Sequence, residues 1–169
     1  DYLYTENDTF QIVRLPYGNK KFEMVVILPR KSVNIDSITQ SMDPLKFEAW
    51  LLSTQTQKVK LGLPKFKIAF EKSLKEVLTQ LGMRTPFSQQ ADFSGMSGQK
   101  NLLISEVKHK TFIEVNEEGT EAAAVTGVRI SLTAVPSYRE MIVDRPFIFA
   151  IRERQNGTLL FLGKIVDPE

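Results

Sequence analysis

His109 is the residue best suited to acid–base chemistry, because it is the single histidine among 169 residues and the chain has no cysteine. A Ser–His–acid triad would have to use it, yet lysines flank it in EVKHKTF and no G-x-S-x-G motif occurs. A cysteine nucleophile, a disulfide framework and zinc sites built from cysteine and histidine are excluded. Neither common glycine-rich phosphate loop is present. Hydrolase and nucleotide chemistry are therefore not expected. We further expect that the protein is not an enzyme and that it uses no cofactor and no metal.

The composition is that of a globular protein, with 42% hydrophobic and 25% charged residues and a formal charge of +2. A chain of this length can bury the core of one domain. The small net charge gives no indication of a nucleic-acid or membrane partner, and no apolar run approaches the roughly 20 residues of a membrane helix. The chain opens with the strand-like DYLYTEND, so we expect it to start inside a domain.

Hydrophobic periodicity predicts an α+β protein with mainly antiparallel sheets. We expect strands at 9–17, 21–29, 57–71, 102–116, 145–154 and 158–166, and helices at 34–40, 44–52 and 72–83. The second strand is almost continuously apolar, so both of its faces should be buried. Gly18-Asn19 and Asn156-Gly157 predict the turns of two hairpins, and Asp43 is predicted to cap the second helix.

The segment EEGTEAAAVTG follows the strand at 102–116 where a tight turn and a partner strand would be expected, and VRISLTAVPSYREM continues without an obvious partner. In an extended conformation Thr120, Ala122, Ala124 and Thr126 would share one face. Taken alone, the three alanines predict a helical turn more strongly, because alanine is the best helix former. The residues by themselves therefore favour a helix at a place where the surrounding pattern favours a strand.

Two motifs here are specific. NEEGTEAAAVT, followed about two dozen residues later by MIVDRPFIFAI, resembles the hinge and the carboxy-terminal signature of the serpins. LPKFKI resembles the strand that leads into the main sheet of that family. KSLKEVLTQLGM and ADFSGMSGQKNLLISEVKHKTFIEVNEEGT resemble the helix, loop and fifth strand of its sheet A, and GTLLFLGKIVDPE resembles the closing strand of its sheet B.

This resemblance covers essentially the whole chain, and it implies the serpin fold, with antiparallel sheets A, B and C and a few short helices. It further implies that residues 1–169 are the carboxy-terminal portion of a single serpin domain, with a reactive-centre loop at about 119–140. The amino-terminal part of the same serpin would be its structural partner. By itself the piece could also be an inert cleavage product or assembly partner.

An inhibitory serpin offers this loop to a protease, and after cleavage the amino-terminal part of the loop inserts as a new strand of sheet A. The resemblance thus implies a serine-type endopeptidase inhibitor that acts once, by covalent trapping, with cysteine proteases as a second target class. Small side chains suit such insertion. The alternative is a non-inhibitory serpin, such as a chaperone, carrier or storage protein, whose hinge tends to be bulky or charged. The implied hinge residues are Glu117, Glu118, Gly119, Thr120, Glu121, Ala122, Ala123, Ala124, Val125 and Thr126.

The scissile bond would set the specificity of the inhibitor. Counting from Glu117 as the first hinge residue places the bond after Thr133, whereas counting back from the VDRPF signature gives Val135. We expect cleavage between Thr133 and Ala134, with Val135 as the alternative. Small and β-branched residues there favour elastase-like or subtilisin-like proteases. Arg129 and Arg139 would suit a trypsin-like protease, but neither way of counting places the scissile bond beside them.

Residues outside the loop also take roles from the resemblance. His109 aligns with the histidine of the serpin shutter region, a structural role in sheet opening. Lys65 and Glu117 match a family ion pair at the top of sheet A. We interpret the lysines between 58 and 67 as a solvated face rather than a polyanion site. An extracellular or secreted location is expected in preference to a cytoplasmic one.

Overall fold

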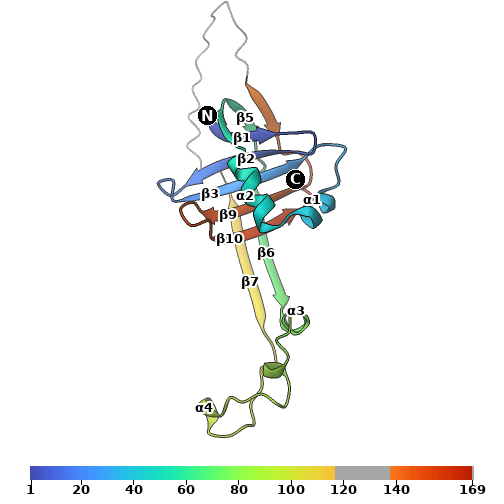
Figure 1. Cartoon of the computed structure of the whole chain (residues 1–169), viewed down its shortest axis with the longest axis vertical. Coiled ribbons are helices and arrows are strands. Elements are labelled where there is room, and N and C mark those ends of the chain that lie inside the picture. The colour runs from blue at the N-terminus through green and yellow to red at the C-terminus, as the bar shows by residue number, and fades with distance from the viewer. Residues whose placement is uncertain (117–137, 169) are drawn as a thin grey trace, which may run out of the picture. The chain divides into compact units, whose positions relative to one another are not determined.

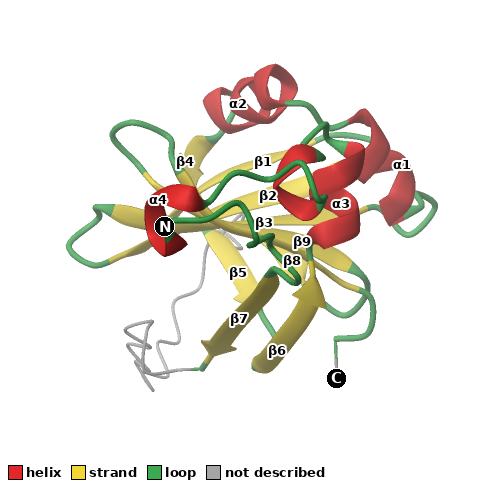
Figure 2. Cartoon of the chain, turned by 90° about the horizontal axis from the view of Figure 1, so that it is seen from below, coloured by secondary structure: helices red, strands yellow, loops and turns green. Residues whose placement is uncertain are grey.

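The computed structural model describes residues 1–116 and 138–168, and the chain forms two compact units. One unit comprises Asp1–Lys65 together with Asn116–Glu169, and the other comprises Phe66–Val115. Figure 1 follows the chain by residue number, and Figure 2 separates its helices, strands and loops.

The first unit is built on a six-stranded antiparallel sheet with the strand order β10-β9-β3-β2-β1-β4. Figure 1 labels the first five of these strands, and Figure 2 labels β4. The apolar strand β3 lies inside this sheet between β2 and β9, and every residue from Glu23 to Pro29 is buried. Burial on both faces, as the sequence predicts, is confirmed. The strands are β1 (Tyr2–Glu6), β2 (Phe10–Tyr17), β3 (Phe22–Pro29), β4 (Gln55–Gln57), β9 (Phe147–Glu153) and β10 (Leu159–Ile165).

Two capped helices, α1 (Ile35–Ser41) and α2 (Pro44–Leu52), contribute to the core of this unit. The Asn34 side chain accepts from the Asp36 amide at 2.8 Å, and the predicted cap Asp43 accepts from the Lys46 amide at 2.8 Å. Each cap satisfies a backbone donor that the helix itself leaves unpaired. The core that the helices share with the sheet consists of Phe10, Ile12, Val25, Ile27, Ile35, Ile38, Phe47, Leu51, Ile148 and Ala150.

Both predicted hairpin turns are present. The first has more residues with positive φ than expected, and the second has fewer. Gly18, Asn19 and Lys20 have φ values of 52°, 54° and 65°, so the turn recruits a lysine as well. In the second turn Gly157 has φ 75°, and its amide donates to the Glu153 carbonyl at 3.1 Å. Asn156 is not in the left-handed region; it closes the turn through its side chain, which accepts from the Thr158 amide at 2.9 Å.

A second, two-stranded sheet of this unit pairs β5 (Val59–Gly62) with β8 (Arg139–Ile142) in parallel. The end of the YREM segment therefore has a partner after all, and the last two residues of the loop expected at 119–140 belong to β8. Sequence reasoning missed this because a parallel pair joins distant segments and has no turn signal to announce it.

The second unit contains β6 (Phe66–Ser73) and β7 (Lys108–Val115), which form an antiparallel pair. The predicted strand at 57–71 is therefore interrupted: it covers the last residue of β4, the whole of β5 and most of β6, and Pro64 lies between β5 and β6. The predicted helix at 72–83 is shorter, because Lys72 and Ser73 still belong to β6, and the predicted strand at 102–116 starts only at Lys108. The other elements of the second unit are α3 (Lys75–Gln80), a 3-10 turn (Thr85–Phe87) and α4 (Ser94–Ser97).

Candidate functional site

The β6–β7 ladder places the start of one strand beside the end of the other. Its register runs from Phe66 opposite Val115 to Ser73 opposite Lys108. The chain therefore enters β6 and leaves β7 at the same end of the ladder. The segment 117–137 begins two residues after Val115 and leads to Tyr138, directly before β8.

Alternation along β6 and β7 separates an apolar face from a charged face, as the two-residue period of a strand requires. On the charged face Lys67 lies 3.6 Å from Glu114, and Lys110 lies 2.9 Å from Glu71. Both pairs are directly opposite in the register, and opposite charges at such positions favour that register over a slipped one. The half-buried side chains of the other face are Phe66, Ile68, Thr111, Ile113 and Val115.

β7 has one strand neighbour, β6, among the residues that the structure describes. Its other edge pairs with no strand in that part of the chain, so its outward backbone N–H and C=O groups can accept an added strand. The segment 117–137 leaves from the end of this same strand. A chain that reversed there would run antiparallel to β7.

The far end of the segment is fastened through β8. The Arg139 amide donates to the Lys58 carbonyl at 2.8 Å, and the Val143 amide donates to the Gly62 carbonyl at 2.8 Å. The side chains of Lys60 and Glu140 form an ion pair of 2.7 Å, which supports the solvated interpretation of that lysine. Met141 is fully buried, so β8 also contributes to the packing of its unit.

The VDRPF motif has a packing role in this structure. Phe147 is fully buried, and the Arg145 guanidinium donates through Nε to the Pro29 carbonyl at 2.9 Å. The same guanidinium pairs with the adjacent Asp144 at 2.8 Å. The motif thus holds the start of β9 against the end of β3.

The predicted site residues fall into two groups. His109 lies on β7, opposite Lys72, with an exposed side chain whose ring meets that of Phe70 edge-on at 6.5 Å. Lys65 is exposed and directly precedes β6, whereas its predicted partner Glu117 lies outside the described residues. The rest of the hinge, from Glu118 to Thr126, and the bond residues Thr133, Ala134 and Val135 also lie outside them. Their roles stay predictions.

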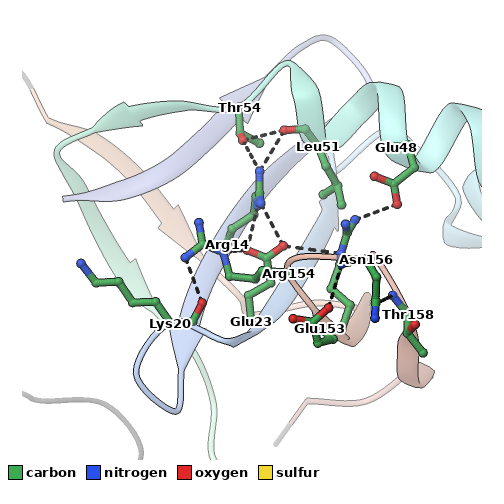
Figure 3. A network of polar contacts seen from close by, with 11 residues as sticks. Arg14, Lys20, Glu23, Glu48, Leu51, Thr54, Glu153, Arg154, Asn156 and Thr158 are labelled. Carbon is green, nitrogen blue, oxygen red and sulfur yellow. Dashed lines mark hydrogen bonds and ion pairs between the residues drawn. The ribbon is translucent and has the colours of Figure 1, made fainter.

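A buried charge cluster, which the sequence analysis missed, lies in the first unit (Figure 3). Glu23 is 1% exposed and accepts from Arg14 through both carboxylate oxygens, at 2.9 and 3.0 Å. Arg154 approaches the same carboxylate at 3.3 Å, and Arg152 at 3.7 Å. A single acid within the apolar strand KFEMVVILP was the available signal, because a buried carboxylate requires cationic partners.

Two arginines of this cluster also contact α2 or the residues that follow it. Arg152 also binds Glu48 of α2 at 2.8 Å, while Arg14 donates to the Leu51 carbonyl and to Thr54. The bonds join β2, β3 and β9 to the end of α2. We assign the cluster a structural role, since the groups that surround the carboxylate neutralise it.

The described residues contain no group of three or more histidine or acidic side chains that could hold a metal ion. Within the same residues, no helix is long and apolar enough to cross a membrane.

The likeness of this chain to solved structures defines the class of protein. Mouse protein-Z dependent protease inhibitor matches 99% of this chain over 43% of its own length, with a TM-score of 0.83 and 31% identity. Thyroxine-binding globulin, solved in complex with thyroxine, matches with a TM-score of 0.82 and 29% identity over 99% of this chain and 44% of its own. This is the fold of the serpins.

A family model described as serpin (serine protease inhibitor) matches residues 1–168. The chain belongs to the serpin family. Human neuroserpin is 40% identical over 95% of this chain and 39% of its own length. Bovine leukocyte elastase inhibitor is 39% identical over 98% of this chain and 45% of its own length. The chain thus spans about two fifths of the length of these curated relatives, one of which is named as an inhibitor of a protease.

Proposed function

We propose that this chain supplies the bait segment and the accepting strand edge of a protease inhibitor that traps its target covalently by loop insertion. The observation that carries the proposal is the β6–β7 ladder, whose strand β7 has an edge without a strand neighbour in the described chain. The hinge predicted from the sequence follows at the end of β7. Serpin loop insertion is itself a standard example of strand addition and of a switch driven by stored strain.

The residue types of the segment suit this step energetically. Each backbone hydrogen bond made on insertion contributes about 1 kcal/mol net, and a strand beside the eight residues of β7 would make several. The inward side chains would be Thr120, Ala122, Ala124 and Thr126, which are small enough to pass between strands. A bulky or charged residue there would oppose insertion, because it would have to be desolvated.

The proposed cleavage lies between Thr133 and Ala134, with Val135 as the alternative. The target would be an elastase-like or subtilisin-like serine protease, with cysteine proteases as a second class. One relative is named a leukocyte elastase inhibitor, which supports the first choice. The amino-terminal part of the same serpin would complete the sheet on which insertion occurs. We place the protein outside the cell, although its relatives come from sources as different as an archaeon and mammals.

The second candidate is a non-inhibitory carrier of the same fold. The likeness to thyroxine-binding globulin in complex with thyroxine favours it. The small residues of the hinge favour the inhibitor. The two candidates differ in one measurable property. After the segment is cut, an inhibitor stays covalently bound to the protease, whereas a carrier does not.

The test is to mix the full-length protein with elastase, subtilisin and trypsin and to separate the products by SDS electrophoresis. An adduct that survives SDS supports inhibition. Cleavage in the segment without an adduct contradicts the trapping mechanism and favours the carrier. Mass analysis of the released peptide places the cut, and a cut away from residues 133–135 contradicts the proposed bond.

A further inference from the structure

Strand β8 is short, and its own sheet gives it a single strand neighbour in the described part of the chain. It has four residues and pairs in parallel with β5 alone among the residues that the structure describes. Isolated two-stranded pairs are marginal in water, and parallel pairing is slightly less stable per residue than antiparallel pairing. Further contacts must therefore keep β8 in place.

Gln11 of β2 makes one such contact. Its side chain is buried, with 6% of the residue exposed. Its Nε2 donates to the backbone carbonyl of Glu140 in β8 at 2.9 Å and to the Tyr4 hydroxyl at 2.7 Å. Both amide hydrogens are thus used, and one of them fixes the backbone of β8 to the six-stranded sheet.

Glu6 of β1 makes the other contact. Its carboxylate accepts from the Tyr4 hydroxyl at 2.9 Å and from Arg30 at 2.9 Å, and it lies 3.2 Å from Nη1 of Arg139 in β8. Burial raises the pKa of Tyr4 to about 12, so its hydroxyl stays protonated and can donate to Glu6. Tyr4 therefore connects the Glu6 contact to the Gln11 contact.

We propose that Tyr4, Glu6 and Gln11 form a clamp, called the β8 clamp here, whose positioning residues Glu6 and Gln11 hold the carboxyl-terminal anchor of the segment 117–137. This role rests on the proposed function, since it assumes that the segment is the bait. With the clamp intact, β8 stays paired with β5. Without the clamp, β8 should open more often, and we expect inhibitory activity to be lost faster.

The first test uses Gln11→Met in the full-length protein, because methionine keeps the side-chain volume and removes both donors. Backbone amide exchange at Arg139 and Val143 should become about fivefold faster, as the loss of one hydrogen bond predicts. Exchange at Val26 inside the six-stranded sheet should not change. The half-life of inhibitory activity at 37 °C should shorten, while the adduct formed by freshly prepared protein stays the same.

A second variant keeps the test decisive if Gln11→Met does not fold. Arg139→Gln removes the Glu6 contact from a side chain that is 60% exposed, so the core is untouched. It should also accelerate exchange in β8, and Arg139→Lys should restore most of the protection. Lys46→Gln removes an exposed pair of α2 and serves as the matched control without effect on β8.

Failure of the clamp and failure of the proposed function would give different results. Exchange in β8 that equals the wild type in both folded variants would overturn the clamp, whatever the inhibitory activity. Failure of the wild type to form an adduct with any protease would overturn the proposed function, while the exchange measurement would still decide whether the clamp holds β8.

Discussion

Gly163 of β10 lies directly opposite Phe149 of β9, and the phenylalanine ring occupies the space that a side chain at 163 would need. A Cβ added there would meet Cε1 and Cζ of Phe149 at 2.5 and 2.6 Å. Because Phe149 is only 4% exposed, its ring has little room to withdraw.

Gly163→Ala should therefore lower the free energy of unfolding by about 1–3 kcal/mol, as overpacking a core does. Urea unfolding of the full-length protein measures it. Gly95→Ala is the matched control, since nothing lies within 4 Å of its added Cβ. Equal stability of the two variants would contradict the overlap.

Glu23→Gln should destabilise the protein strongly, because it leaves Arg14, Arg152 and Arg154 around a neutral amide. Removing one partner of a buried ion cluster costs about 3–5 kcal/mol. Glu48→Gln, at a carboxylate whose side chain is 48% exposed, should cost no more than about 1 kcal/mol. Thermal and urea unfolding of both variants provide the comparison, and a smaller loss for Glu23→Gln than for Glu48→Gln would show that the cluster is dispensable.

Acid should weaken the protein partly through Glu6. Partial burial alone would raise the pKa of Glu6, but hydrogen bonds from Tyr4 and Arg30 and the charges of Arg30 and Arg139 lower it below the ordinary 4.5. The ionised carboxylate therefore stabilises the folded state above that pH, and the contribution is lost as the pH falls through the folded-state pKa. The Tm of Glu6→Gln should fall less steeply than that of the wild type below about pH 5. Parallel curves would mean that Glu6 does not contribute.

If the segment inserts as proposed, the Thr120→Arg variant of the full-length protein should be cleaved as a substrate without trapping the protease. An inserted strand would have to carry the guanidinium into the sheet, and an unpaired charge there is strongly disfavoured. Electrophoresis should show cleavage of the segment without an SDS-stable adduct. Glu121→Arg, at the outward face of the same extended segment, is the control, and it should trap the protease as the wild type does. Unchanged trapping by Thr120→Arg would refute insertion.

The full-length protein cut in the segment should resist heat better than the uncut protein. Insertion as proposed would add a strand to β7, and each new backbone hydrogen bond would contribute about 1 kcal/mol net. Scanning calorimetry of the two forms should show a higher Tm after cleavage. A Tm that does not rise would mean that the segment stays outside the sheet.

Local residues carried most of the fold prediction. The left-handed residues Gly18 and Asn19, the cap Asp43 and the apolar run of β3 each act over a few positions, and the structure confirms all of them. The end of β6 is different. Lys72 and Ser73 fit a helix by composition, but pairing with His109 and Lys108 keeps them extended. A partner some 35 residues away cannot be seen in local periodicity.

For the candidate site, too, short sequence motifs could be predicted and long-range contacts could not. The VDRPF motif was recognisable as a short sequence pattern, whereas the parallel partner of β8 was not. The hinge lies outside the described residues and stays a prediction. Gln11 carried no signal either, because a glutamine in an alternating strand is ordinary until its amide is seen to reach the Glu140 carbonyl. Contacts that depend on long-range register were thus beyond sequence reasoning.

The position of β9 between β3 and β10 has a consequence for the piece that follows any cut in the segment. That piece contains β8, β9 and β10, and β9 is hydrogen-bonded along β3 from the other side of the break. The two fragments would consequently travel through a gel-filtration column as a single particle and separate only in detergent. Detergent electrophoresis, rather than gel filtration, is therefore the method that would reveal a cut chain.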